Sequence, residues 1–408
     1  MPDAFKHPGP TRRAVLAGSA AAVLAGRAHA QGAPVRLGVL TDMSGFARDT
    51  NGPGSVQAVH MAVAEFGGAV LGRPVEVLVA DHQEKVDLGV QIARKWFDED
   101  GVRAVIDVPN SAIGIGVHNL ARDKDRIALL GGTFSSDVTN ALCSPNTAQF
   151  GLDTYAMGNV LATALLADGA RSWFFITADF AFGAALEADA TAAVRKGGGT
   201  VVGSIKHPIA TSDFSSFLLQ AQSSGADVIA FANSAGDTVN SIKQAAEFGL
   251  VGKRQKLAAL LMFETNIHAI GLAAAGGVYA TVWSYWDTDD RTRSWSRQFF
   301  GKVGAMPTMA QTSSYSGTLH YLKAVQAAGT LDTRAVMDQM RALPVEDAFV
   351  HGGVLRADGR VVKDVMLGRI KTTTESKADW DYVALLRAVP GSQAFRPVAD
   401  SRCPLLRA

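Results

Sequence analysis

This chain of 408 residues has little cysteine, few long apolar runs and almost no excess of one charge over the other. Lys and Arg number 39 against 38 Asp and Glu, giving a formal net charge of only +1, so we expect no nucleic-acid partner. Two cysteines are too few for a disulfide scaffold or a four-cysteine zinc site. With 14 prolines against 41 glycines, the composition also excludes a proline-rich linker.

Catalytic motifs are missing as well. The glycine-containing segment 38–45 lacks the Gly-x-Gly-x-x-Gly turn of dinucleotide-binding proteins. The sequence contains no phosphate-binding Gly-Lys-Thr/Ser loop, no Gly-x-Ser-x-Gly nucleophile turn and no His-Glu-x-x-His zinc motif. We therefore expect a protein that is not an enzyme and that has no cofactor and no metal.

The first thirty residues have the order of an export signal. Three basic residues precede an uncharged apolar stretch at 14–26, and the small-x-small sequence at 28–30 predicts cleavage after Ala30. Segment 11–16 resembles a twin-arginine signature, with Thr and Val in place of the usual Ser and Phe. Removing 1–30 leaves a net charge of −2. No later apolar run is long enough for a membrane helix, so we expect a periplasmic mature chain that is not membrane-embedded.

From residue 35 onward, strand-type runs alternate with apolar stripes at helical spacing. The first run predicts strands at 35–40, 75–80, 104–108 and 127–130, with helices at 56–66, 88–97 and 113–121 between them. The second run predicts helices at 155–166, 184–194, 214–222 and 238–248, with strands at 173–177, 200–205, 228–232 and 257–262. This βαβ repetition is typical of mainly parallel sheets covered on both faces.

A third set of elements follows the two runs. It comprises a strand at 278–285, helices at 291–300, 315–327 and 333–343, a hairpin within 352–370, and about thirty irregular residues at the end. Because compact α/β domains hold roughly 100–200 residues, we expect this set to complete the first half rather than to fold alone.

Several segments after the predicted strands form a recognisable set: 38–45 (Gly-Val-Leu-Thr-Asp-Met-Ser-Gly), 81–83 (Asp-His-Gln), 110–111 (Asn-Ser), 179–183 (Asp-Phe-Ala-Phe-Gly) and 211–215 (Thr-Ser-Asp-Phe-Ser) followed by 225–229 (Gly-Ala-Asp-Val-Ile). Together they resemble the type I periplasmic solute-binding proteins of ABC importers, in the leucine/isoleucine/valine-binding family. Segments 41–44 and 51–55 also resemble a subgroup associated with aromatic acids.

The resemblance implies an α/β fold of two Rossmann-like lobes joined by three crossovers. Lobe 1 would comprise 34–149 plus 277–345, lobe 2 would comprise 150–276 plus 346–400, and 401–408 would be a tail. The implied role is capture of a small-molecule solute by hinge closure and delivery to the membrane permease of an ABC importer. The solute would be a small carboxylate, either an aromatic acid or a branched-chain amino acid-like one. The same fold serves extracytoplasmic sensors that signal to a receptor or kinase, and this alternative stays open.

Candidate site residues follow from the fold class, because open parallel sheets bind ligands beyond the carboxyl ends of their strands. In the first half they are Ser44, Asn110, Ser111, Gly132, Thr133, Phe134 and Ser135. In the second half they are Asp153, Tyr155, Phe182, Asn233, Asp237, Phe263 and Glu264, and Tyr285 ends the strand expected to return to the first half. The aromatic members would make the cleft more aromatic than a zwitterion requires, which favours an aromatic or branched apolar carboxylate.

Most of these residues also have a purely structural interpretation. Asn110, Ser111, Asp153 and Asp237 are residue types that cap helices, and capping is the favoured interpretation for Asp237. Glycines at 131–132 predict either an ordinary turn or a close backbone approach to the solute. Phe182, Trp283, Tyr285 and Trp286 belong either to the cleft or to the core. Glu264 either holds a ligand ammonium or caps the next helix, with Phe263 then facing inward.

Cys143 and Cys403 are the only thiols of the chain. In an oxidising compartment an even pair predicts a disulfide, here one that pins the C-terminal tail near the region between the lobes. Two free thiols are the alternative.

Overall fold

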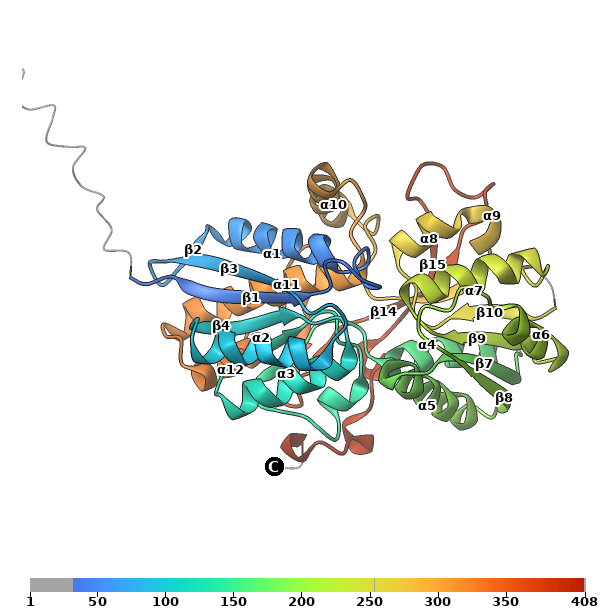
Figure 1. The fold of residues 1–408 in the computed structure, drawn as a ribbon, viewed down its shortest axis with the longest axis horizontal. Helices are drawn as coiled ribbons and strands as arrows, with labels where there is room; N and C mark the ends of the chain where they lie inside the picture. The colour runs from blue at the N-terminus through green and yellow to red at the C-terminus, as the bar shows by residue number, and fades with distance from the viewer. Residues whose placement is uncertain (1–31, 253, 407–408) are drawn as a thin grey trace, which may run out of the picture.

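The computed structural model describes residues 32–252 and 254–406, and the expected signal segment 1–30 lies outside them. Two large sheets, each with its own helices, form the two halves of the molecule (Figure 1). This α/β architecture with mainly parallel sheets confirms the predicted fold class.

The first sheet has the strand order β2-β3-β1-β4-β5-β6, in which every neighbouring pair except β2–β3 is parallel. In the central strand β1 only Arg36 is not fully buried, because helices cover both faces of the sheet. The strands are β1 (Val35–Thr41), β2 (Ala69–Val70), β3 (Arg73–Asp81), β4 (Val102–Asp107), β5 (Ile127–Leu130) and β6 (Thr147–Gln149).

Helices from both ends of the chain cover the first sheet (Figure 1). Helices α2 and α3 pack their apolar residues on one face, whereas α1 and α11 pack together on the other. The helices of this half are α1 (Gly52–Phe66), α2 (Val86–Asp98), α3 (Ser111–Asp123), α10 (Asp290–Val303), α11 (Met309–Ala328) and α12 (Thr333–Ala342). Helices α11 and α12 thus complete the first half, as the sequence predicts.

The second sheet has the order β15-β14-β11-β10-β9-β7-β8. Strands β8, β7, β9, β10 and β11 pair in parallel, and β14 and β15 are antiparallel additions at one edge. The strands are β7 (Ser172–Ala178), β8 (Thr200–His207), β9 (Val228–Ala232), β10 (Lys256–Ala259), β11 (Tyr279–Val282), β14 (Val365–Ile370) and β15 (Val383–Val389). The helices are α4 (Thr154–Ala167), α5 (Ala181–Lys196), α6 (Ser215–Ser223), α7 (Ala235–Glu247), α8 (Glu264–Ile270), α9 (Leu272–Ala275) and α13 (Gly391–Ala394).

The parallel cores of the two sheets have the same order: second strand, first, third, fourth and fifth. In such a doubly wound sheet the chain turns in opposite directions from the first strand and from the third, which opens a crevice at their carboxyl ends. The crevice positions are therefore the ends of β1 and β4 in one half and of β7 and β9 in the other.

The structure corrects two expectations about the C-terminal part. We expected the strand at 278–285 to return to the first half, but β11 pairs with β10 and β14 in the second sheet. The chain therefore crosses between the sheets after β6, after β11 and between α12 and β14, and the second crossing falls after Val282 rather than at 276–277. We also expected irregular structure over the last thirty residues, yet β15 forms the edge of the second sheet.

Short elements complete the described chain. Strands β12 (Val354–Leu355) and β13 (Val361–Val362) pair with each other in antiparallel fashion. Three single turns of 3₁₀-helix lie at η1 (Ser136–Thr139), η2 (Val398–Asp400) and η3 (Pro404–Leu406).

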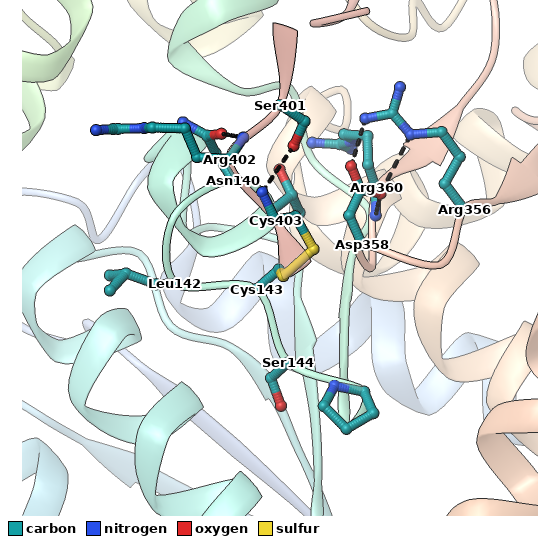
Figure 2. The surroundings of a disulfide bond; sticks show 12 residues. Asn140, Leu142, Cys143, Ser144, Arg356, Asp358, Arg360, Ser401, Arg402 and Cys403 are labelled. Carbon is teal, nitrogen blue, oxygen red and sulfur yellow. Dashed lines mark hydrogen bonds and ion pairs between the residues drawn. A yellow bond between two sulfur atoms is a disulfide. The ribbon is translucent and has the colours of Figure 1, made fainter. Parts of the chain in front are cut away.

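A disulfide joins Cys143 to Cys403, as the sequence predicts, with 5.6 Å between their Cα atoms (Figure 2). It connects the loop after η1 with the tail, and the backbone N–H of Arg402 donates to Oδ1 of Asn140 (2.7 Å) beside it. The C-terminal tail is therefore fixed to the first half rather than to the second half, whose sheet edge it follows in sequence.

Candidate functional site

A cavity lies where the carboxyl ends of the two sheets meet. From the first half it is lined by Phe46, Ala47, Thr50, Asn51, Glu84, Pro109, Asn110 and Phe134. From the second half it is lined by Phe180, Phe182, Ser234, Ala235, Leu261 and Phe263. These residues follow β1, β3, β4 and β5 on one side and β7, β9 and β10 on the other. The cavity therefore includes all four crevice positions that the strand order defines.

Phenylalanine rings from both halves meet across this cavity. The Phe134 ring, after β5, lies 6.4 Å from that of Phe182 and 6.2 Å from that of Phe263, measured between centroids. Phe180 and Phe182 are 5.8 Å apart in the same way. Rings at these separations attract one another through their edges and faces. An apolar or aromatic group would find ring surfaces contributed by both lobes.

Backbone strain concentrates at the ends of the strands that border the cavity. Gln83 and Glu84 follow β3 with φ of 52° and 57°, and Asp107 and Val108 at the end of β4 have φ of 79° and 57°. A β-branched residue such as Val108 rarely adopts positive φ. Strained residues of this kind persist where the surrounding structure holds them, often at functional sites.

The buried carboxylate of Asp107 provides part of that support. It accepts hydrogen bonds from Thr41 Oγ1 (2.7 Å), Asn51 Nδ2 (2.8 Å) and Ser314 Oγ (3.1 Å). These donors come from β1, from the residue before α1 and from α11. Burial raises the pKa of Asp107, while its hydroxyl and amide donors act in the opposite direction. The network fixes Asn51 at the wall of the cavity.

Glu84 is the only ionisable side chain among the residues that line the described cavity. Its Oε2 accepts a hydrogen bond from Asn110 Nδ2 (2.7 Å), and Oδ1 of Asn110 caps α3 by accepting from the N–H groups of Ala112 and Ile113. Burial is the main cause that raises the pKa of Glu84, and the negative charges of Asp42 and Asp81 add to it. The charged form of Glu84 therefore lacks a cationic partner in the cavity.

Four of the predicted site residues line this cavity: Asn110, Phe134, Phe182 and Phe263. Phe263 faces inward and Glu264 is not among the lining residues, which answers the question that the sequence left open. Glu264 is instead the first residue of α8 and is buried. At this place the ring of Phe263, and not the carboxylate of Glu264, lines the cavity.

The other predicted residues of the first half support the wall without lining it. Ser44 donates to Asp81 (2.6 Å), Thr133 donates to the carbonyl oxygen of Val108 (2.5 Å), and Ser135 caps η1. Ser111 is the buried first residue of α3. At Gly132 a Cβ atom would come within 2.6 Å of Asn51 Nδ2 and 2.8 Å of Asp107 Oδ1. This glycine therefore permits close packing within the wall.

Asp153 and Tyr155 lie at the first crossover and contact the C-terminal segments instead of the cavity. Asp153 caps α4 by accepting from the Ala156 N–H (2.7 Å), and it pairs with the buried Arg360 at 3.6 Å. The ring of Tyr155 packs under the guanidinium of Arg396 at 4.5 Å. Tyr155 is not among the residues that line the cavity, and its contact with a solute stays a prediction.

Asn233, Asp237 and Tyr285 are engaged in local hydrogen bonds. Asn233 accepts from Thr238 and donates to Ser241 in the turn after β9. The carboxylate of Asp237, inside α7, accepts from the backbone N–H groups of residues 210 and 211 and so fixes the loop after β8. The hydroxyl of Tyr285 donates to the Trp380 carbonyl and accepts from the N–H groups of residues 382 and 383.

Sequence reasoning missed several lining residues. They are Phe46, Ala47, Thr50, Asn51, Glu84, Pro109, Phe180, Ser234, Ala235 and Leu261. Phe46 to Asn51 lie in the long loop between β1 and α1, beyond the residues that directly follow the strand. The sequence does contain a signal for Glu84, because this acid lies two residues past the Asp-His pair at 81–82, where β3 ends.

Two lobes of the same strand order, enclosing a cavity at their facing carboxyl ends, define a solute-binding protein of the two-lobed type. A family model described as periplasmic binding protein matches residues 34–377, and the chain belongs to this family. Within it, the chain has the type I fold and is related to the leucine/isoleucine/valine-binding proteins, as the sequence motifs predict.

Individual relatives agree with this assignment. A crystal structure of a periplasmic binding protein from Burkholderia mallei is 42% identical, covering 91% of this chain and 99% of that one, with a TM-score of 0.88. A branched chain amino acid ABC transporter periplasmic ligand-binding protein from Burkholderia xenovorans LB400 is 39% identical, covering 91% and 100%, with a TM-score of 0.84. These relatives are binding proteins rather than enzymes.

A curated relative gives a shorter match. The Leu/Ile/Val-binding protein homolog 6 of Brucella melitensis is 27% identical over 248 residues, which are 59% of this chain and 62% of that relative. The chain thus matches less than two thirds of the length of this relative. Between residues 32 and 406, apart from position 253, no helix combines the length and apolar character needed to cross a membrane.

Proposed function

We propose that this chain is the extracytoplasmic solute-binding subunit of an ABC importer. It would capture a small carboxylate, aromatic or branched-chain amino acid-like, between its lobes and present it to a membrane permease after hinge closure. The observation that carries this proposal is the cavity lined by residues from both lobes at the carboxyl ends of their strands. A solute held there would contact both lobes at once and so favour the closed arrangement.

Helix N-termini give this cavity a means of holding a carboxylate. The residues that precede α1, α5 and α7 are Asn51, Phe180 and Ser234, and all three line the cavity. None of them accepts a capping hydrogen bond through its side chain. Pro53 of α1 has no N–H, and the Asp237 N–H of α7 already donates to the Ser234 carbonyl. The other first-turn N–H groups of these helices are the ones that would meet an anion, which the helix dipoles also favour.

A ligand panel tests the proposal. The mature chain would be titrated with branched-chain and aromatic amino acids, aromatic acids and amides, with thermal unfolding and calorimetry as the readouts. A solute present at 100 times its dissociation constant should stabilise the protein by about 2.7 kcal/mol. Closure on binding should also reduce the radius of gyration measured by small-angle scattering.

Two substitutions test whether the ligands of the panel bind in this cavity. Phe182→Ala removes a lining ring and should weaken binding at least tenfold, whereas Leu219→Ala, on the exposed face of α6, should leave binding unchanged. Absence of stabilisation by every acid tested, or equal affinities for Phe182→Ala and the unmodified chain, would reject the proposed site.

A further inference from the structure

Arg360 is one of the largest fully buried side chains among the residues that the structure describes. Arginine is almost never fully buried in proteins unless its charge is paired. Burial lowers the pKa of Arg360 to about 10, so its guanidinium stays charged at neutral pH. Arg360 is not among the residues that line the cavity between the lobes. The burial of this charge therefore has a reason other than lining the cavity.

The three crossovers between the halves meet at Arg360, which lies in the third crossover, between α12 and β14 (Figure 2). Its Nη2 atom donates to the carbonyl oxygen of Gly151 in the first crossover, and its backbone forms a parallel bridge with Gln149 at the end of β6. In the second crossover, the ring of Trp283 has its centroid 5.7 Å from the guanidinium carbon, within reach of a cation–π interaction. One side chain thus contacts every segment by which the chain passes between the halves.

Two residues of the second lobe contact the same guanidinium. Nη1 lies 3.6 Å from Oδ2 of Asp153, the residue that caps α4. The ring centroid of Phe395, directly after α13, lies 4.8 Å from the guanidinium carbon. Burial raises the pKa of Asp153, and the positive charge of Arg360 acts in the opposite direction. The start of α4 is therefore held at the point where the crossovers meet.

Lys363 connects two of the crossovers in a similar way. Its Nζ donates to the carbonyl oxygens of Trp283 in the second crossover and of Phe349 in the third, and it lies 4.4 Å from the centroid of the Trp283 ring. Of these two cations of the described chain, Arg360 is the one that also contacts the first crossover.

We propose that Arg360 is a positioning residue for hinge closure, because its guanidinium couples the three crossovers so that they turn together. This inference rests on the proposed function, of which closure is one step. Crossovers that bent independently would allow the lobes many open arrangements, few of which could close on a solute. The apparent dissociation constant rises as the fraction of binding-competent arrangements falls. Arg360 therefore raises the affinity from outside the cavity lining.

Distances between spin labels on the mature chain, measured without ligand, test the coupling. The labels are attached at Arg94→Cys in α2 and Gln222→Cys in α6, two exposed positions in different lobes of a chain with no free thiol among its described residues. Arg360→Lys keeps the positive charge but replaces the planar guanidinium with a single nitrogen. We expect the distribution of lobe-to-lobe distances to become at least twice as wide. A residue that only stabilised the fold would lower the melting temperature and leave this width unchanged.

Affinity is the second measurement. Because Arg360 does not line the cavity, Arg360→Lys should weaken every ligand that binds by the same factor, at least threefold, whereas Phe182→Ala should affect different ligands unequally. Arg356→Lys is the matched control. Arg356 lies in the same crossover, but it donates to Asp358 and to the carbonyl oxygen of Arg396, neither of which belongs to the first or second crossover. This control should leave both the distances and the affinities unchanged.

A second variant serves if Arg360→Lys does not fold. Arg360→Met combined with Asp153→Asn removes both buried charges, asparagine still caps α4, and the same broadening is expected. An unchanged distance distribution in the folded variant, or equal broadening in Arg356→Lys, would overturn the role of Arg360 and leave the solute-binding function standing. A broadened distribution together with no binding by any ligand of the panel would support the role of Arg360 and reject the proposed ligand class.

Discussion

Buried acids of the second lobe control how the stability of the protein responds to pH. Glu264 is only 5% exposed, and burial raises its pKa from 4.5 to about 8. Burial likewise raises the pKa of Asp237 from 3.8 to about 6, although its carboxylate accepts two backbone N–H groups. In both cases the folded chain keeps a proton at pH values where the unfolded chain has lost it, so folding becomes less favourable as pH rises through that window.

We predict that Glu264→Gln makes the protein more stable at pH 8 than the unmodified chain. The glutamine stays neutral, so the variant avoids the loss of stability that burial of Glu264 imposes between pH 4.5 and about 8. Each unit of pKa shift corresponds to about 1.4 kcal/mol. Denaturant unfolding at pH 5, 6, 7 and 8, without ligand, should show a difference between the two proteins that grows with pH.

Glu247→Gln is the control, because Glu247 is the exposed last residue of α7. Its unfolding free energy should follow that of the unmodified chain at each pH. A constant difference between Glu264→Gln and the unmodified chain across the range would show that Glu264 keeps its ordinary acidity.

At the level of single residues, the sequence predicts the apolar wall better than the polar one. Phe134, Phe182 and Phe263 lie shortly after strand ends, where a parallel sheet places its ligand, and all three line the cavity. Glu84 is equally near the end of β3 and Asn51 lies further along its loop, but the position of Glu84 depends on strained backbone and that of Asn51 on the buried Asp107. Such tertiary contacts between β4, α1 and α11 leave no local pattern in the sequence.

At the level of elements, close helix packing sets the shape of the second lobe. Helices α4 and α5 cross where Gly158 faces Ala190, and a Cβ atom on Gly158 would lie 2.6 Å from Cα and 2.8 Å from N of Ala190. Because these neighbours are backbone atoms, no side-chain rotation relieves the contact. α4 also follows the first crossover directly, so a shift of α4 would move one joint between the lobes.

We predict that Gly158→Ala destabilises the protein by about 1–3 kcal/mol through overpacking, although alanine is the better helix former by about 1 kcal/mol. Gly301→Ala is the matched control, because Gly301 lies within α10 with no atom within 4 Å of the added Cβ. That substitution should stabilise by up to about 1 kcal/mol. Chemical denaturation of both variants measures the difference, and stabilisation by both would contradict the packing of α4 on α5.

The sequence predicts most of the helices and strands, but it does not predict which strands pair at the edge of the second sheet. The alternation of strand and helix patterns predicts the parallel strands from β1 to β10, except for the short β6, because each βαβ unit pairs with its neighbours in order. Strand β11 has an apolar pattern that fits either sheet, so its place beside β10 depends on packing. β15 is an edge strand with several exposed residues, and it therefore lacks the buried pattern that marks the central strands.

At the level of the whole molecule, the disulfide joins two segments that are far apart in the sequence. Cys143 and Cys403 are separated by 260 residues, and the segment between them contains the entire second sheet and the first-half helices α10, α11 and α12. Neither cysteine lines the cavity. The bond therefore constrains the unfolded chain and holds the tail on the first lobe away from the cavity lining.

We predict that the double variant Cys143→Ser, Cys403→Ser loses up to about 5 kcal/mol of stability, because a loop of this length restricts the unfolded ensemble strongly. The affinity for any solute should stay within a few-fold of that of the unmodified chain. Denaturant midpoints with and without reductant provide the measurement: reductant should lower the midpoint of the unmodified chain to that of the variant and leave the variant unaffected. Two alkylatable thiols in the native mature protein, or a variant as stable as the unmodified chain, would show that the tail is held by its packing and by the contacts of Arg402 with Asn140 and Asp137.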